Sequence, residues 1–230
     1  ITTDEYIEIK TNPGMITQLT LPDSSKVWLN SESSLKYPLK FTGETREVTL
    51  NGEAYFKVEK DLKHKFIVST ANNIRIEVLG TEFNVEAYSK NEDVITTLVN
   101  GKIGLSYLSA ENDVRHLLMT PNQKSVYNTL NRTAVTTSVD VESDIAWIDG
   151  KIIFNNTSLE NALKILSKRF NVDFIIKNPK LKDYSFSGTF EHQRLDRILE
   201  YFKISSNIKS RYITTYNNTN KVDKSIIEIY

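Results

Sequence analysis

The sequence predicts a mainly β amino-terminal domain, followed by a small α/β carboxy-terminal domain built from a repeated β-α-β unit. Three observations lead to this fold class. Apolar residues alternate with polar ones through most of the first 138 residues, the composition turns acidic over 139–149, and a helical apolar period then recurs after 36 residues. We place the boundary in the acidic segment and expect domains over 1–145 and 146–230.

Residues 48–88 are the centre of the predicted β domain. The alternating apolar positions of the first run are Val48, Leu50, Ala54, Phe56 and Val58. Further short alternating runs follow closely, and Asn51-Gly52 and Gly80-Thr81 are interpreted as changes of chain direction. No helical period fits, so we expect an antiparallel unit, either a sandwich or a solenoid-like roll.

The flanking segments extend the same pattern. Upstream, Leu21-Pro22-Asp23-Ser24 predicts a turn before a strand in which Val27 and Leu29 share one face. Downstream, Asn100-Gly101 between two alternating runs predicts a β-hairpin. Two more strands are expected near 117–119 and 124–127. The lone Trp147 in the acidic segment is expected to pack where the two domains join.

The carboxy-terminal domain begins with a predicted strand at 152–154. Thr157 and Glu160 have the spacing of a capping box, which predicts a helix that ends at Asn171. Its apolar face is formed by Leu159, Ala162, Leu163, Leu166 and Phe170. Shifting the register by 36 residues places Phe154 on Phe190 and Asn171 on Asn207, so the unit is repeated. Two such units are expected to share one sheet, with a last strand in 221–230.

Composition excludes several function classes. The 29 basic and 29 acidic residues cancel, whereas nucleic-acid binders carry a basic excess, so no nucleic-acid partner is expected. No cysteine is present, which excludes disulfides and thiolate sites. His64, His116 and His192 lack metal-ligand spacing and are interpreted as surface residues, so we expect neither a metal nor a cofactor. No apolar run is long enough to span a bilayer.

No assembled catalytic motif is visible, and we expect a protein that is not an enzyme. A G-x-S-x-G nucleophile elbow is absent, as is a glycine-rich phosphate loop. Glu53 and Glu82 lie on neighbouring predicted strands and could in principle form a glycosidase pair. Because each alternates with buried residues, both are expected to face water.

The run from Tyr184 to Phe190 favours a binding function over a catalytic one. If this run lies at a sheet edge, its unpaired backbone groups could accept a strand from a partner. Tyr184, Phe186 and Gly188 are therefore the candidate partner-binding residues. The competing interpretation is that Phe186 and Phe190 belong to the core of the second repeat, and for Phe190 that interpretation is preferred.

Several motifs, in their order, resemble the periplasmic region of FecR-like anti-sigma regulators. They are LPDSSKVWLNSESSLKYP from Leu21, GEAYFKV, FIVST, VLGTEFNVEAY, TTLVNGKI and PNQ. Ser24 and Asn122 stand where that family often has Gly, and both turns are expected to survive. The carboxy-terminal LxxALxxL, the following NV and FSGTF resemble the short domain at the amino-termini of secretins and TonB-dependent transporters.

This resemblance implies a cellular location and a set of partners. The chain would be the periplasmic sensor part of a protein anchored in the inner membrane. It would contact the signalling domain of a TonB-dependent outer-membrane transporter, and a periplasmic protease would then act on the regulator. A sigma factor would be bound by a cytoplasmic domain that, like the anchor, we expect to lie outside this chain. The alternatives are a secretin-like assembly module and a β-sandwich carbohydrate-binding or hydrolytic protein.

Overall fold

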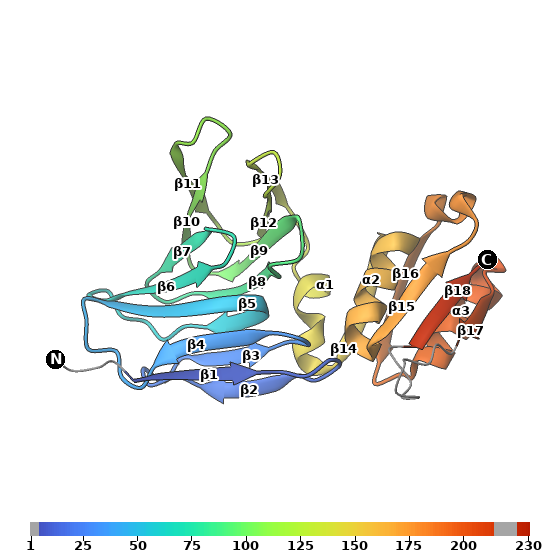
Figure 1. The fold of residues 1–230 in the computed structure, drawn as a ribbon, viewed down its shortest axis with the longest axis horizontal. Helices are drawn as coiled ribbons and strands as arrows, with labels where there is room; N and C mark the ends of the chain where they lie inside the picture. Colours follow the sequence, from blue (N-terminus) through green and yellow to red (C-terminus); the bar gives the residue numbers. More distant parts are fainter. Residues whose placement is uncertain (1–4, 214–224) are drawn as a thin grey trace, which may run out of the picture. The chain divides into compact units, whose positions relative to one another are not determined.

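The computed structural model describes residues 5–213 and 225–230, and the chain divides into two compact units, Ile1–Ile148 and Asp149–Tyr230. The fold class predicted from the sequence is confirmed, because the first unit is built from β-strands and the second mixes helices with short strands (Figure 1). Each unit has its own cluster of buried apolar side chains. They are described in turn.

The first unit is a curled sheet of thirteen strands that folds into two layers. The strands are β1 (Tyr6–Lys10), β2 (Thr17–Thr20), β3 (Lys26–Leu29), β4 (Ser34–Pro38), β5 (Thr45–Lys57), β6 (Lys65–Thr70), β7 (Arg75–Val78), β8 (Glu82–Ala87), β9 (Asp93–Asn100), β10 (Ile103–Leu108), β11 (Val114–Met119), β12 (Gln123–Asn128) and β13 (Thr133–Ser138). One layer runs β1-β4-β5-β6-β7-β10-β11 and the other β2-β3-β5-β8-β9-β12-β13.

The long strand β5 belongs to both layers. Its first half pairs with β4 and β6, and its second half pairs with β3 and β8. The change occurs at Gly52. Its φ of +115° is a conformation that glycine adopts readily and other residues rarely do, and a Cβ there would lie 2.3 Å from the Ser33 Oγ. Asn51-Gly52 is therefore a corner within one strand rather than the predicted change of direction. The unit is also not purely antiparallel, because β5 and β6 pair in parallel.

Two other glycine positions carry the chain from one layer to the other. Gly80, at φ +152°, joins β7 to β8, and Gly101, at φ +97°, joins β9 to β10. The hairpin predicted at Asn100-Gly101 is wrong: β9 pairs with β8 and β12, whereas β10 pairs with β7 and β11. The strands predicted near 117–119 and 124–127 are confirmed as β11 and β12.

Apolar side chains from the facing layers form the core of the first unit. Phe56 of β5 stacks on Phe83 of β8 at 5.1 Å between ring centroids, and it contacts Phe66 of β6 at 6.1 Å. All three rings are fully buried. The alternation seen in the sequence places them there, because side chains of a strand alternate between its two faces.

Residues 139–148, here called the strap, follow β13 and contain helix α1 (Glu142–Ile145) and the start of a 3-10 turn, η1 (Ala146–Asp149). The strap lies on the outer face of the second layer. Asp144 accepts a hydrogen bond from the Thr97 hydroxyl at 2.8 Å and pairs with Lys124 at 2.7 Å. The Trp147 indole donates to the Asn84 Oδ1 at 3.3 Å. Asn84, Thr97 and Lys124 are cross-strand neighbours on β8, β9 and β12.

The second unit contains the predicted repeat. Its elements are β14 (Lys151–Ser158), α2 (Leu159–Phe170), β15 (Val172–Ile176), η2 (Pro179–Asp183), β16 (Ser185–Glu191), α3 (Leu195–Ser206), β17 (Ser210–Ile213) and β18 (Ser225–Ile229). Both helices end at an asparagine in the left-handed conformation, Asn171 and Asn207, as the 36-residue shift requires. The cap of α2 is Ser158 rather than Thr157, since Ser158 accepts from the Asn161 N–H.

The two repeats do not share one sheet as predicted. Their first strands, β14 and β16, pair with each other, whereas their second strands, β15 and β17, flank β18. Each sheet therefore takes one strand from each repeat, and the helices bury their apolar faces in the same core as both sheets. The last strand predicted in 221–230 is confirmed as β18 for its described part.

Candidate functional site

The three predicted partner-binding residues differ in how far they are exposed to solvent. Phe186 is only 4% exposed, and its ring packs on Phe202 of α3 at a centroid distance of 4.3 Å. It is therefore a core residue, and its side chain is not offered to a partner. Phe190 is half-buried and contacts Phe154 at 5.6 Å, which confirms the interpretation preferred for it. Tyr184 is 42% exposed and is the one side chain of the three that is open to solvent.

The direction in which the backbone N–H and C=O groups of β16 point decides which of them a partner strand could reach. The Tyr184 C=O accepts from the Leu159 N–H on the β14 side, and backbone direction alternates along a strand. The backbone groups of Phe186 and Gly188 therefore also point toward β14. Those of Ser187 and Thr189 point to the other edge, where the Ser187 C=O already accepts from the Tyr201 hydroxyl at 3.1 Å.

A second strand edge was not found by sequence reasoning. In the three-stranded sheet, β17 pairs with β18 on one side and with no described strand on the other. Lys209 and Tyr230 exchange both backbone hydrogen bonds, at 2.8 and 3.0 Å. By alternation, Ser210 and Tyr212 direct their N–H and C=O groups away from β18. Tyr212 is 55% exposed, and the alternation of this short strand was the only sequence signal for it.

A groove of about 390 Å³ lies between this edge and α3. Its lining residues are Asp196, Leu199, Glu200, Lys203, Lys209, Ser210, Tyr212 and Tyr230. Partial burial and, after it, the negative charge of Asp196 raise the pKa of the Tyr212 phenol. The groove thus joins an apolar floor, two aromatic side chains and charged groups beside open backbone, which is the chemistry of a peptide-binding edge.

The opposite face of the same sheet carries an ion-pair cluster. Glu228 of β18 contacts Lys177 at 2.8 Å and Arg211 at 2.5 Å. Its hydrogen bonds to Lys177 and then to Arg211 hold the pKa of the Glu228 carboxyl below its ordinary value. The cluster joins β17, β18 and the residue that follows β15, so it fixes the sheet that presents the β17 edge.

Glu53 and Glu82 do not form a carboxylate pair. Glu82 lies opposite Lys57 and Glu53 opposite Glu86, so they are separated by four residues along the strands, or about 13 Å. Glycosidase carboxylates are about 5–9.5 Å apart. The expectation that both face water is also wrong for Glu53, which is 5% exposed and accepts from the Asn30 and Asn84 amides at 2.8 and 3.0 Å.

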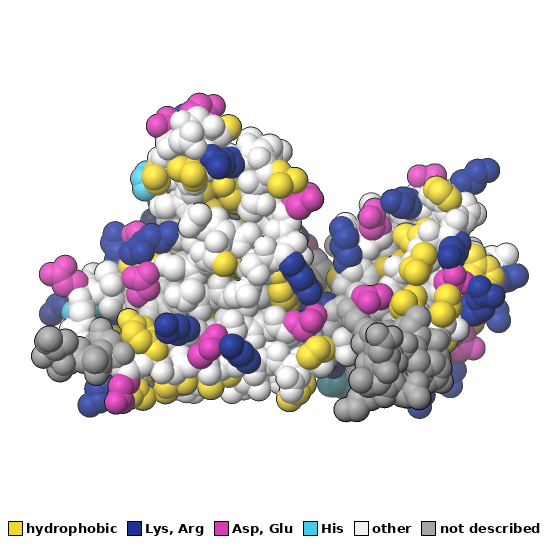
Figure 2. All heavy atoms as spheres, viewed as in Figure 1, with side chains coloured by type: hydrophobic (Ala, Val, Ile, Leu, Met, Phe, Trp, Pro, Cys, Tyr) yellow, Lys and Arg dark blue, Asp and Glu magenta, His cyan; other side chains and the backbone are white. Residues whose placement is uncertain are grey.

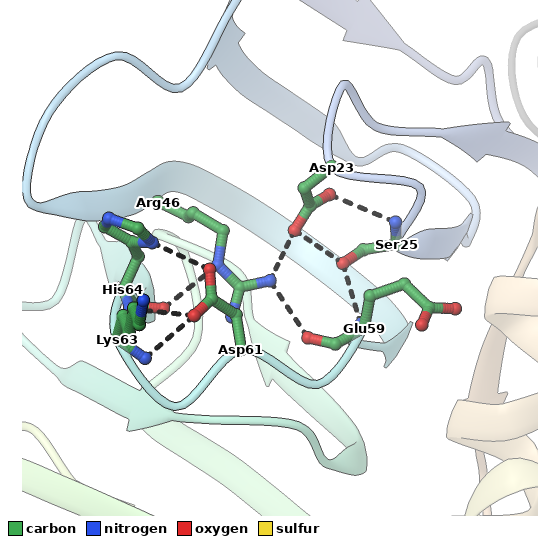
Figure 3. A network of polar contacts seen from close by, with 7 residues as sticks. All are labelled: Asp23, Ser25, Arg46, Glu59, Asp61, Lys63 and His64. Atoms are coloured by element: carbon green, nitrogen blue, oxygen red, sulfur yellow. Dashed lines mark hydrogen bonds and ion pairs between the residues drawn. The ribbon is translucent and has the colours of Figure 1, made fainter.

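The three histidines are exposed, as expected, and no group of three potential metal ligands occurs among the described residues. His64 belongs to a polar network around Arg46 (Figure 3). Arg46 pairs with Asp23 at 2.6 Å and donates to the backbone carbonyls of Glu59 and His64 at 3.0 and 3.1 Å. These contacts fasten the Leu21–Ser24 turn to the loop before β6, and the network is interpreted as structural.

Comparison with known proteins identifies the class. The FecR protein family matches residues 7–104, and the family described as FecR, C-terminal, matches residues 151–220, each within one of the two units. The combination defines a two-part regulatory protein. The chain belongs to the FecR-like anti-sigma factors, as its sequence motifs predicted.

Solved structures support this assignment over almost the whole chain. A proposed anti-sigma factor from Parabacteroides distasonis, at 1.65 Å resolution, is 28% identical with a TM-score of 0.79, covering 97% of this chain and 98% of its own. A second structure so described from that organism, at 2.50 Å, is also 28% identical, with a TM-score of 0.78 and coverage of 98% and 99%. A search of curated proteins found no match. Among the described residues, no helix has the length and apolar character needed to cross a membrane.

Proposed function

We propose that this chain is the periplasmic sensor portion of a transmembrane anti-sigma regulator. In this proposal, it receives a signal from a TonB-dependent outer-membrane transporter and relays it to an extracytoplasmic-function sigma factor. The sigma factor would be bound by another part of the protein, on the cytoplasmic side of the inner membrane. The activity assigned to the chain is protein binding, with no chemical step.

Two observations together carry the proposal. Both FecR family models match this chain, and in the small unit β16 and β17 each have one edge that pairs with no described strand. A partner can add a strand to such an edge, which gives affinity through main-chain hydrogen bonds. Tyr184, exposed immediately before β16, is proposed as a further contact residue, whereas Phe186 and Gly188 are assigned to the fold and to the β14 pairing.

The surface is consistent with a protein partner rather than a nucleic acid. On the face shown in Figure 2, acidic and basic side chains are interspersed over the described residues, without a broad basic area. The net charge of zero agrees with this. Phosphate backbones are bound mainly by clustered Lys and Arg, so we expect only weak affinity for DNA or RNA.

The test is direct binding. The 230-residue chain is titrated calorimetrically with each purified signalling domain of the TonB-dependent transporters encoded in the same genome. We expect one domain to bind with a Kd in the micromolar range or tighter, about −8 kcal/mol. A complete set of folded signalling domains that all fail to bind would overturn the proposal. A sigma-dependent reporter strain, with the intact regulator, then checks that loss of binding abolishes induction.

A further inference from the structure

The edge of β17 has two properties that favour an added strand. Its outward N–H and C=O groups, on Ser210 and Tyr212, make no hydrogen bond to another described residue. The side chains of the same two residues line the groove toward α3. A strand added to this edge would therefore place every second side chain over the groove, since side chains alternate between faces.

The unpaired charge in the groove is positive. Asp196 is paired with Arg194 at 3.2 Å, and Glu200 is paired with Arg197 at 2.9 Å. In contrast, Lys203 and Lys209 are exposed and make no ion pair with any other residue that the structure describes. An incoming carboxylate would meet two available ammonium groups, so charge complementarity favours an acidic segment.

Apolar contacts define the rest of the ligand. Leu199, 5% exposed, forms the floor of the groove, and Tyr212 and Tyr230, 55% and 46% exposed, stand beside it. Tyrosines supply large contact areas at low entropic cost and are common at the centre of binding interfaces. The groove thus suits one apolar or aromatic side chain next to an Asp or Glu.

We propose that β17 and the α3 groove are the surface by which this chain docks its protein partner, and that the partner adds an extended, acidic segment to β17. The bound segment alternates, with an apolar side chain over Leu199 and a carboxylate between Lys203 and Lys209. This inference rests on the proposed function and assigns its surface: the occupant is a strand of the transporter signalling domain.

The first test uses proline at two strand edges. Tyr212→Pro removes an N–H that faces the open side of β17, and Thr189→Pro does the same at the open side of β16. Both variants are made in the full chain and titrated with the signalling domain that binds the unmodified chain. We expect Tyr212→Pro to weaken binding at least about tenfold and Thr189→Pro to leave it within about twofold, because only β17 is the docking edge.

The second test leaves the backbone unchanged. The double variant Lys203→Glu/Lys209→Glu reverses the free charge of the groove, and Lys164→Glu, on the exposed face of α2, is the matched control. We expect the double variant to lose at least about tenfold in affinity and the control to match the unmodified chain. Circular dichroism melting verifies that each variant is folded.

The outcomes separate the two proposals. Binding by the unmodified chain that survives both Tyr212→Pro and the lysine reversal overturns the β17 docking surface but leaves the proposed function standing. If Thr189→Pro alone loses binding, the docking edge is β16. The β17 docking surface is then overturned, and the proposed function still stands. If the unmodified chain binds no signalling domain, the proposed function itself fails.

Discussion

Trp147 of the strap donates its indole N–H to Asn84, and Asn84 in turn donates its side-chain amide to the buried Glu53. The three side chains form a line of hydrogen bonds from the strap through β8 into β5. Because Asp144 holds the same segment to β9 and β12, the strap is bound to neighbouring strands of one layer. Its attachment is therefore open to mutational test.

Removing the Asp144 carboxylate should loosen the strap. Asp144→Ala leaves Lys124 and Thr97 without their acceptor, and we expect the free energy of unfolding to fall by about 1–2 kcal/mol. Urea denaturation followed by Trp fluorescence measures this, since Trp147 is three residues away. Glu142→Ala, an exposed change on the same short helix, should alter stability by less than about 0.5 kcal/mol. Equal losses in both variants would contradict the assigned role of Asp144.

Glu53 should be costly to remove despite its position on a strand. Glu53→Ala leaves the buried amides of Asn30 and Asn84 without an acceptor, so we expect a loss of about 3 kcal/mol. The measurement is the denaturation midpoint in urea at neutral pH. Glu44→Ala, in an exposed loop, serves as the control and should leave the midpoint nearly unchanged.

The forked guanidinium of Arg46 should not be replaceable by lysine. Arg46→Lys keeps the charge but cannot contact Asp23 and two carbonyl groups together, and we expect a loss of about 2 kcal/mol. Arg75→Lys is the matched control, because the Arg75 side chain is 42% exposed and its pairs with Glu47 and Glu77 are worth less than about 1 kcal/mol. Similar thermal melting of the two variants would argue against a structural role for the Arg46 network.

The loop beside Arg46 should respond to acid. The hydrogen bond from His64, followed by that of the Lys63 backbone N–H, lowers the pKa of Asp61 from 3.8 to about 2. A lowered pKa stabilises the folded state above the unfolded value, and this contribution is lost as the pH falls from about 4 through 2. An NMR titration of the Asp61 carboxyl should give a midpoint near 2. In His64→Ala the midpoint should rise toward 3.8, and an unchanged midpoint would contradict the assigned cause.

The corner in β5 should tolerate no side chain. Gly52→Ala would place a Cβ 2.3 Å from the Ser33 Oγ at a φ of +115°, and we expect a loss of about 2–3 kcal/mol. Gly104→Ala is the control, since its added Cβ would meet nothing closer than 3.8 Å. Thermal melting of both variants checks the difference. A stable Gly52→Ala protein would mean that β5 does not require glycine at its corner.

Periodicity predicted which residues are buried and which form helices. The alternation around Phe56 and the 36-residue shift from Asn171 to Asn207 both reappear in the structure. These signals are local, because each depends on one element presenting one apolar face. The same logic found α2, and it misplaced the cap by one residue because Thr157 and Ser158 can both accept the hydrogen bond.

Local sequence patterns do not predict which strands pair with each other. A glycine at positive φ marks a bend, but it does not say which strand pairs next. The sequence therefore predicts turns at Gly52 and Gly101, whereas in the structure both are the points where the chain passes between layers. Glu53 was expected in water because its neighbours alternate. In the fold both faces of that part of β5 are covered, and the two amides that bond Glu53, from Asn30 and Asn84, lie 23 and 31 residues away along the chain.

The groove at β17 was missed for a similar reason. Its walls come from α3, β17 and the residue after β18, and no motif links them along the chain. The sequence favours Tyr184, Phe186 and Gly188 because aromatic residues and a glycine lie close together there. In the structure, Phe186 packs on Phe202 within the core.

Because β5 is shared by both layers, the two layers of the first unit are joined through one continuous strand. Disrupting the strand on one side of Gly52 removes the central member of the other side as well. We therefore expect the first unit to unfold in one cooperative transition, with no state in which a single layer persists.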